Sequence, residues 1–150
     1  MSIANDVHEM IQFTVDFPEN YKEKKMPILD LKVWMNDMKE IEYLFYEKPM
    51  RSNLVIGKKS ALPQSMKMRS LTQEAFRRIH NTRENLHEEF LPDTLTKFMQ
   101  KLKESGYTEE DRFNILKGGM KTHENIEKLE REGMRDYYRT PATRQKERKR

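Results

Sequence analysis

The sequence contains no cysteine. This absence excludes a disulfide framework, a zinc site built on thiolates and a cysteine nucleophile. It is typical of a protein in a reducing compartment, so we expect an intracellular location, with nucleus and cytoplasm both left open. The apolar runs fall far short of the roughly 20 residues that cross a bilayer, and residues 1–15 lack the apolar stretch of a signal peptide. We therefore expect no membrane contact.

Large apolar residues are scarce as well. Hydrophobic residues make up 35% of the 150 positions, and Leu, Ile, Val and Phe together account for 31 of them. That share is only slightly above the level of about 20% that is associated with disorder. The length suits one modest domain or part of a larger fold, and the composition limits it to a thin core. We interpret the eleven methionines as gap-filling side chains in that core.

Charge is nearly balanced over the whole chain but uneven along it. There are 29 basic and 25 acidic residues, which gives a net charge of +4. Residues 51–83 alone carry a net +7 and residues 135–150 a net +5, whereas residues 1–50 and 84–134 each carry −4. The basic block at 51–83 is therefore a local feature, and we expect the function to lie there.

Alternating apolar and polar residues predict a β-hairpin over residues 28–47. The alternation occupies residues 29–35 and 41–45, with a polar turn between them. Two strands alone are only marginally stable in water, so the hairpin needs a further strand or a helix against its apolar face. A short alternating stretch at 13–17 and the apolar run at 54–56 are the candidate strands.

Helical periodicity begins after Pro63. Ser70-Leu71-Thr72-Gln73 has the form of a capping box and predicts a helix that ends near Asn81. A second helix is expected from about Pro92 to Ser105-Gly106, where glycine accepts the left-handed conformation. Residues 3–11 also show helical spacing of apolar side chains.

A third helix is expected after Thr108, because a capping residue is followed there by three acidic residues. Phe113, Leu116 and Met120 are its predicted inward face. Gly118-Gly119 costs about 2 kcal/mol relative to two alanines and predicts a kink or break.

The order of these elements predicts an α+β fold, in which a small antiparallel sheet precedes a helical bundle. We divide the chain into a β-hairpin region at 1–60, a helical region at 61–133 and a basic disordered tail at 134–150. The tail is expected to add nucleic-acid contacts or to act as a nuclear address.

Known catalytic and metal-binding patterns are missing. The four histidines form no His-Glu-x-x-His pair, and no Asp-Asp pair occurs. Gly57-Lys58-Lys59-Ser60 resembles a phosphate loop, but Ser52 stands where that motif needs a glycine. We therefore predict no metal, no cofactor and no catalytic residue, and an independent enzyme is the least favoured hypothesis.

The basic block is the most informative pattern, because clustered cations neutralise phosphates and neighbouring aromatic rings stack on bases. Tyr43, Tyr46 and Phe76 lie near it in the sequence. The alternative is an ordinary solvated surface. The predicted nucleic-acid-binding residues are Lys48, Arg51, Lys58, Lys59, Lys67, Arg69, Arg77 and Arg78.

Three blocks of residues, in this order, resemble reverse transcriptases of metazoan retroelements, with the greatest likeness to Penelope-like enzymes. The blocks are Ile11-Gln12-Phe13-Thr14-Val15-Asp16, Pro27-Ile28-Leu29-Asp30-Leu31 and Phe45-Tyr46-Glu47-Lys48-Pro49. Ser60-Ala61-Leu62-Pro63, the Arg77-Arg78 helix and Lys103-Glu104-Ser105-Gly106-Tyr107 are similar to the next segments of such proteins. The resemblance covers roughly residues 10–117, and Ile28 replaces the phenylalanine that the family usually has.

The resemblance implies that residues 1–50 correspond to the end of a polymerase palm and residues 64–130 to a thumb, which grips the primer–template duplex. The family's catalytic aspartates, in a Tyr/Phe-x-Asp-Asp turn, would precede Met1, and Asp30 matches a non-catalytic aspartate. The implied protein is a fragment that binds RNA–DNA or DNA duplex and is catalytically inert alone. A second hypothesis is a domesticated interaction protein, whose Met- and Phe-bearing helix faces bind a protein partner.

Overall fold

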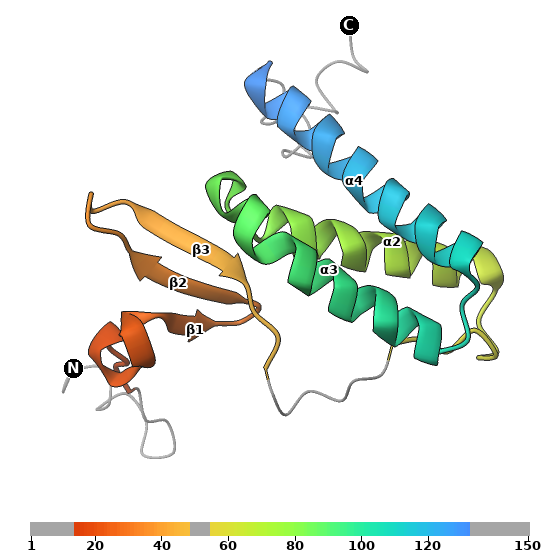
Figure 1. The fold of residues 1–150 in the computed structure, drawn as a ribbon, viewed down its shortest axis with the longest axis horizontal. Coiled ribbons are helices and arrows are strands. Elements are labelled where there is room, and N and C mark those ends of the chain that lie inside the picture. Colours follow the sequence, from red (N-terminus) through yellow and green to blue (C-terminus); the bar gives the residue numbers. More distant parts are fainter. Residues whose placement is uncertain (1–13, 49–54, 133–150) are drawn as a thin grey trace, which may run out of the picture.

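The computed structural model describes residues 14–48 and 55–132. Within these residues, three short strands come first and three long helices follow, so the predicted α+β fold is confirmed. Figure 1 shows the strands on one side and the helices on the other, with α2 and α4 running in the same direction and α3 in the opposite one. The elements are β1 (Met26–Ile28), β2 (Leu31–Met35), β3 (Ile41–Phe45), α2 (Gln64–His80), α3 (His87–Glu104) and α4 (Glu109–Arg131). The helix expected at 3–11 and the basic tail lie outside the described residues.

The predicted hairpin is present as β2 and β3. The two strands pair antiparallel, with Leu31 opposite Phe45 and Met35 opposite Ile41. The turn closes where the Asn36 amide donates to the Glu40 carbonyl at 2.9 Å, and Lys39 takes a φ of 63° there. The alternation of apolar residues was therefore a sufficient signal for this part of the fold.

The third strand is β1, which pairs antiparallel with β2 on the side away from β3. Both strands predicted for this role are wrong. Residues 14–17 form no strand, and Val55 and Ile56 lie in a loop. The pattern missed β1 because Pro27 stands at its centre, and proline, which has no N–H, is confined to edge strands and bulges.

The loop after α2 covers the outer edge of β3. The Arg83 amide donates to the Tyr43 carbonyl at 3.0 Å. The Thr82 hydroxyl accepts from the Phe45 amide at 3.3 Å and donates to the Arg78 carbonyl at 3.1 Å. One buried hydroxyl therefore joins the end of α2 to the sheet.

The predicted start of α2 at Ser70 is wrong, because the helix begins at Gln64. Its first turn is held by a buried cation that no apolar pattern marks. The Lys67 ammonium donates to the carbonyls of Lys58 and Ser60, at 2.6 and 3.2 Å, and so holds the preceding loop against the helix. The predicted end near Asn81 is confirmed.

The second helix, α3, also starts earlier than predicted. It begins at His87, directly after a 3₁₀ turn at Glu84–Leu86, and Pro92 lies inside it. The predicted end is confirmed, since α3 stops at Glu104 and Gly106 has a φ of 89°.

The predicted start of α4 is confirmed as a complete capping box. The Thr108 hydroxyl accepts from the Asp111 amide at 3.2 Å, and the Asp111 carboxylate accepts from the Thr108 amide at 3.1 Å.

The kink predicted at Gly118-Gly119 is wrong, because α4 continues without a break. A Cβ added at Gly119 would lie 2.7 Å from the Ala75 Cβ and 2.9 Å from the Phe76 amide nitrogen. At Gly118 it would lie 2.9 Å from the Thr72 methyl carbon. The two glycines therefore allow α2 and α4 to approach closely, which offsets their low helix propensity.

The core lies among the three helices and includes the loop before α4. The predicted inward face of α4 needs correction, because Phe113 is 60% and Met120 is 48% exposed. Ile115 and Gly119 are buried in their place. The buried cluster consists of Leu71, Ala75, Phe98, Leu102, Tyr107 and Ile115.

Candidate nucleic-acid interface

The structure divides the described members of the predicted nucleic-acid-binding set into two groups. Four of its cations are engaged inside the fold, and three are exposed without an ion pair among the described residues. The engaged cations are Lys58, Lys67, Arg77 and Arg78. The exposed cations are Lys48, Lys59 and Arg69. Arg51 lies outside the described residues.

Arg78 is the most deeply buried of these cations. Its guanidinium carbon lies 4.5 Å from the ring centroid of Phe45 and 4.7 Å from that of Phe98. Its charge is balanced by Glu74 at 2.9 Å and by Glu47 at 3.7 Å. A cation that is 3% exposed in such a setting has a structural role and presents no surface to a phosphate.

Arg77, the preceding residue, also contacts Glu74, and its guanidinium carbon lies 5.6 Å from the ring centroid of Phe45. Its guanidinium donates two hydrogen bonds to the Glu74 carboxylate, at 3.0 and 2.9 Å, and pairs with Asp30 in the connection between β1 and β2. Partial burial alone would lower the pKa of Arg77, but the hydrogen bonds and charges of Glu74 and Asp30 outweigh it and raise that pKa. Arg77 thus remains charged and ties the sheet to α2.

Lys58 joins the loop before α2 to the start of α4. Its ammonium donates to the Asp111 carboxylate at 2.5 Å. Hydrogen bonds from Lys58 and Thr108 hold the pKa of Asp111 below its usual value. Asp111 therefore serves both the capping box and the ion pair.

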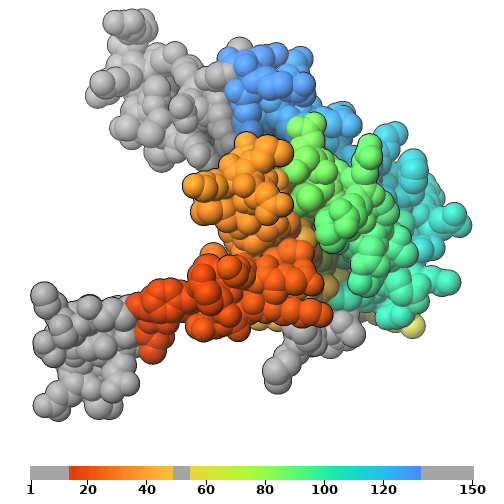
Figure 2. All heavy atoms as spheres, turned by 60° about the vertical axis from the view of Figure 1, so that its left-hand side comes forward, coloured from red at the N-terminus to blue at the C-terminus, as the bar shows by residue number. Residues whose placement is uncertain are grey.

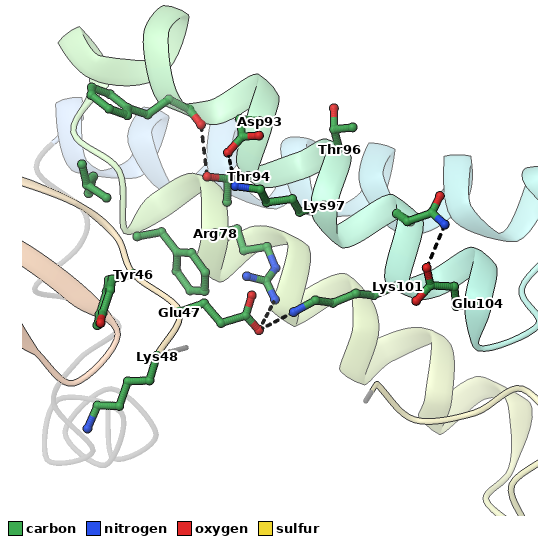
Figure 3. Close-up of a pocket in the computed structure, with 14 residues that line it drawn as sticks. Tyr46, Glu47, Lys48, Arg78, Asp93, Thr94, Thr96, Lys97, Lys101 and Glu104 are labelled. Carbon is green, nitrogen blue, oxygen red and sulfur yellow. Dashed lines mark hydrogen bonds and ion pairs between the residues drawn. The ribbon is translucent and has the colours of Figure 1, made fainter. Parts of the chain in front are cut away.

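A cleft of about 740 Å³ lies between the end of β3 and α3 (Figure 3). Arg78 and Lys101 both approach Glu47 there, and the Lys101 ammonium donates to its carboxylate at 2.7 Å. Lys97 donates to Asp93 at 2.5 Å, one turn away on α3. Most cations of this cleft thus have acidic partners. Figure 2 shows the two surfaces that meet here, with the orange strands against the green helical segment.

The second set of exposed cations lies on α4. Lys117 and Lys121 are exposed, and neither has an ion pair among the described residues. They follow Phe113 at intervals of four residues, so the three side chains form one row along the helix. Sequence reasoning missed this row because acidic neighbours bring the net charge of residues 84–134 to −4, although the four-residue spacing was visible.

Helical geometry relates Arg69, on α2, to Lys121 of the same row. Arg69 stands three residues before Thr72, the residue of α2 that meets Gly118 of α4. Lys117 and Lys121 stand one residue before and three residues after Gly118. Helical geometry places Arg69 and Lys121 on the same side of the α2–α4 contact, opposite α3. The exposed cationic face is defined as Arg69, Lys117 and Lys121.

A polar pocket of about 260 Å³ lies where the end of α2 and the start of α3 meet α4. The His123 ring lies 5.8 Å from that of His80 and 5.7 Å from that of His87, between centroids. The His87 Nε2 lies 2.8 Å from the Thr82 carbonyl, and the His123 Nε2 lies 3.2 Å from Glu127. Within residues 14–48 and 55–132, no group of three or more His, Cys, Asp or Glu side chains is placed to hold a metal ion.

Comparison with protein-family models, curated proteins and solved structures found no match. In the part of the chain that the structure describes, none of the helices combines the length and apolar character needed to cross a membrane.

Proposed function

We propose that this chain binds nucleic acid through the cationic face formed by Arg69, Lys117 and Lys121. The observation that carries the proposal is the exposure of these three cations, without acidic partners among the described residues, on α2 and α4, two helices that pack against each other. Phosphates attract such cations strongly, because each contact releases condensed counterions. Lys48 and Lys59 are exposed as well and remain candidate contacts.

The proposal changes which of the predicted residues are expected to contact the nucleic acid. Arg77, Arg78, Lys58 and Lys67 each have acceptors inside the fold, and engaging a phosphate would break those contacts. A nucleic-acid ligand is therefore expected to meet Arg69 rather than the Arg77-Arg78 pair. The resemblance to the palm and thumb of a reverse transcriptase supports a duplex, either RNA–DNA or DNA, as ligand. No Asp-Asp turn occurs in the chain, so we propose binding without polymerisation.

Fluorescence anisotropy across a series of salt concentrations tests this proposal. Replacing Arg69, Lys117 and Lys121 together by glutamine should weaken binding and reduce the salt slope by about 2 to 3, since each phosphate contact contributes roughly 0.9. The matched control replaces Lys22, Lys97 and Lys103 by glutamine, which removes the same charge from the segment before β1 and from α3. Absence of binding by the wild type at low salt, or equal losses in both variants, would refute the proposal.

A second candidate function is binding of a protein partner through helix faces. It is favoured by the exposure of Phe113 and Met120, which stand two turns apart on α4. Pull-down after nuclease treatment separates the two functions. A partner that is retained by the wild type and lost from a Met120→Gln variant supports protein binding.

A further inference from the structure

We propose that an unpaired base stacks on Phe113, so that the ligand of the cationic face carries single-stranded nucleotides. This inference rests on the proposed function and adds to the proposed duplex ligand a single-stranded part with unpaired bases. It starts from the exposure of Phe113, whose side chain is 60% accessible on a helix that buries Ile115 and Gly119. A ring left in water at such a position contributes little to the core and is available to a ligand.

The side chains that follow Phe113 on α4 favour a nucleic acid over an apolar partner. The Lys117 ammonium lies 6.0 Å from the centroid of the Phe113 ring. Lys121 follows one turn later, so the row offers an aromatic ring for a base and two cations for its flanking phosphates. Four residues advance about 6 Å along a helix, which brings each side chain of the row to a successive point of an extended strand. On this side of Phe113, charge complementarity therefore favours a polyanion with exposed bases.

The geometry also separates a single strand from a duplex. Inside a duplex both faces of each base are covered by its neighbours, and only the terminal pairs expose a base face, so a ring on a convex helix surface finds few base faces to contact. In a single strand the bases are free, and stacking on an aromatic side chain is tolerant of sequence. Phe113 should therefore add affinity only for ligands with unpaired bases, whereas the lysines act on both.

Acidic side chains on the same helix limit the affinity. Glu109 and Glu110 are exposed four and three residues before Phe113, and Glu124 is exposed three residues after Lys121. A phosphate that contacts Lys121 lies near this carboxylate and is repelled by it. Replacing Glu124 by glutamine should therefore tighten binding of single-stranded and duplex ligands alike.

Anisotropy titrations with an oligothymidylate and a blunt DNA duplex of equal length test the inference. Phe113→Ala should weaken binding of the single strand by about tenfold and leave binding of the duplex unchanged. The matched control is Met66→Ala, which removes an exposed apolar side chain from α2. Urea unfolding of both variants shows whether they remain folded.

A second measurement reports directly on stacking. Phe113→Trp in a Trp34→Phe background places the chain's single tryptophan in the row, and the oligothymidylate should quench its fluorescence while the duplex should not. Unchanged affinity in Phe113→Ala, together with loss in Lys117→Gln, would overturn the stacking inference and preserve the proposed function. A wild type that binds neither ligand would overturn both.

Discussion

The guanidinium carbon of Arg78 lies 4.5 Å from the ring centroid of Phe45, and this contact joins α2 to the sheet. The guanidinium carbon also lies 4.7 Å from the ring centroid of Phe98 on α3. Among the apolar residues of the described strands, Phe45 alone is deeply buried. The sheet therefore has few other side chains with which to pack against the helices. Arg78 therefore holds the sheet against the helices together with Arg77 and Thr82.

Replacing Arg78 by methionine should lower the free energy of unfolding by roughly 2–4 kcal/mol. The change removes two contacts between cation and ring and leaves Glu74 and Glu47 without a shared partner. Urea denaturation measures the loss. Arg69→Met, which changes an exposed residue of the same helix, is the control and should alter stability by no more than about 0.5 kcal/mol. Equal effects of the two substitutions would contradict the structural role of Arg78.

Replacing Gly119 by alanine should destabilise the protein by about 1–3 kcal/mol, although alanine favours helices. The added Cβ would meet the Ala75 Cβ and the Phe76 backbone below 3.0 Å, and backbone cannot move aside cheaply. Gly118→Ala is the matched control, because its Cβ would meet only the rotatable Thr72 side chain. In thermal unfolding, the melting temperature of Gly119→Ala should be clearly lower than that of Gly118→Ala. The reverse order would refute the close helix contact.

Replacing Thr82 by valine should cost about 1–3 kcal/mol, because it leaves the buried Phe45 amide without its acceptor. Thr82→Ser keeps the hydroxyl and should cost less. Hydrogen exchange checks the location of the effect, since the Phe45 amide should lose protection in the valine variant and keep it in the serine variant. Equal protection in both variants would show that the hydroxyl does not hold the edge of β3.

Replacing Asp111 by asparagine should make stability less dependent on pH in the acid range. Hydrogen bonds from Lys58 and Thr108 lower the pKa of Asp111 in the folded state. Its contribution is therefore present above the usual aspartate pKa of about 3.9 and is lost as the pH falls through the lower folded value. The variant should be less stable by about 1 kcal/mol near neutrality, with the difference closing on acidification. Urea midpoints at a series of pH values measure it, and a constant difference would contradict the pairing.

Sequence patterns correctly predicted those elements that depend on interactions between residues close together in the sequence. The hairpin followed from side-chain alternation, and the start of α4 followed from the reciprocal bonds of Thr108 and Asp111. The start of α2 depends on Lys67, whose ammonium finds two carbonyl acceptors in a loop that precedes the helix. A lysine at that position looks like a surface residue until the loop is in place.

The charges of the basic block show more clearly that local sequence patterns do not reveal contacts between residues far apart in the sequence. Lys58 pairs with Asp111, 53 residues further on, and Arg77 pairs with Asp30, 47 residues earlier. Charge counted along a segment cannot register partners so distant in sequence, so the block looked more exposed than it is. The kink predicted at the glycine pair of α4 was wrong for a related reason, because Ala75, which Gly119 contacts, lies on another helix.

The covered edge of β3 has a consequence for how separate molecules meet at high concentration. Thr82 and Arg83 occupy that edge, and at the opposite edge β1 is three residues long with a proline at its centre. A strand from another molecule would thus find no continuous ladder of donors and acceptors on either side of the described sheet. We expect concentrated solutions of the folded protein to resist fibril growth, even though Met35 and Ile41 hold apolar side chains in water.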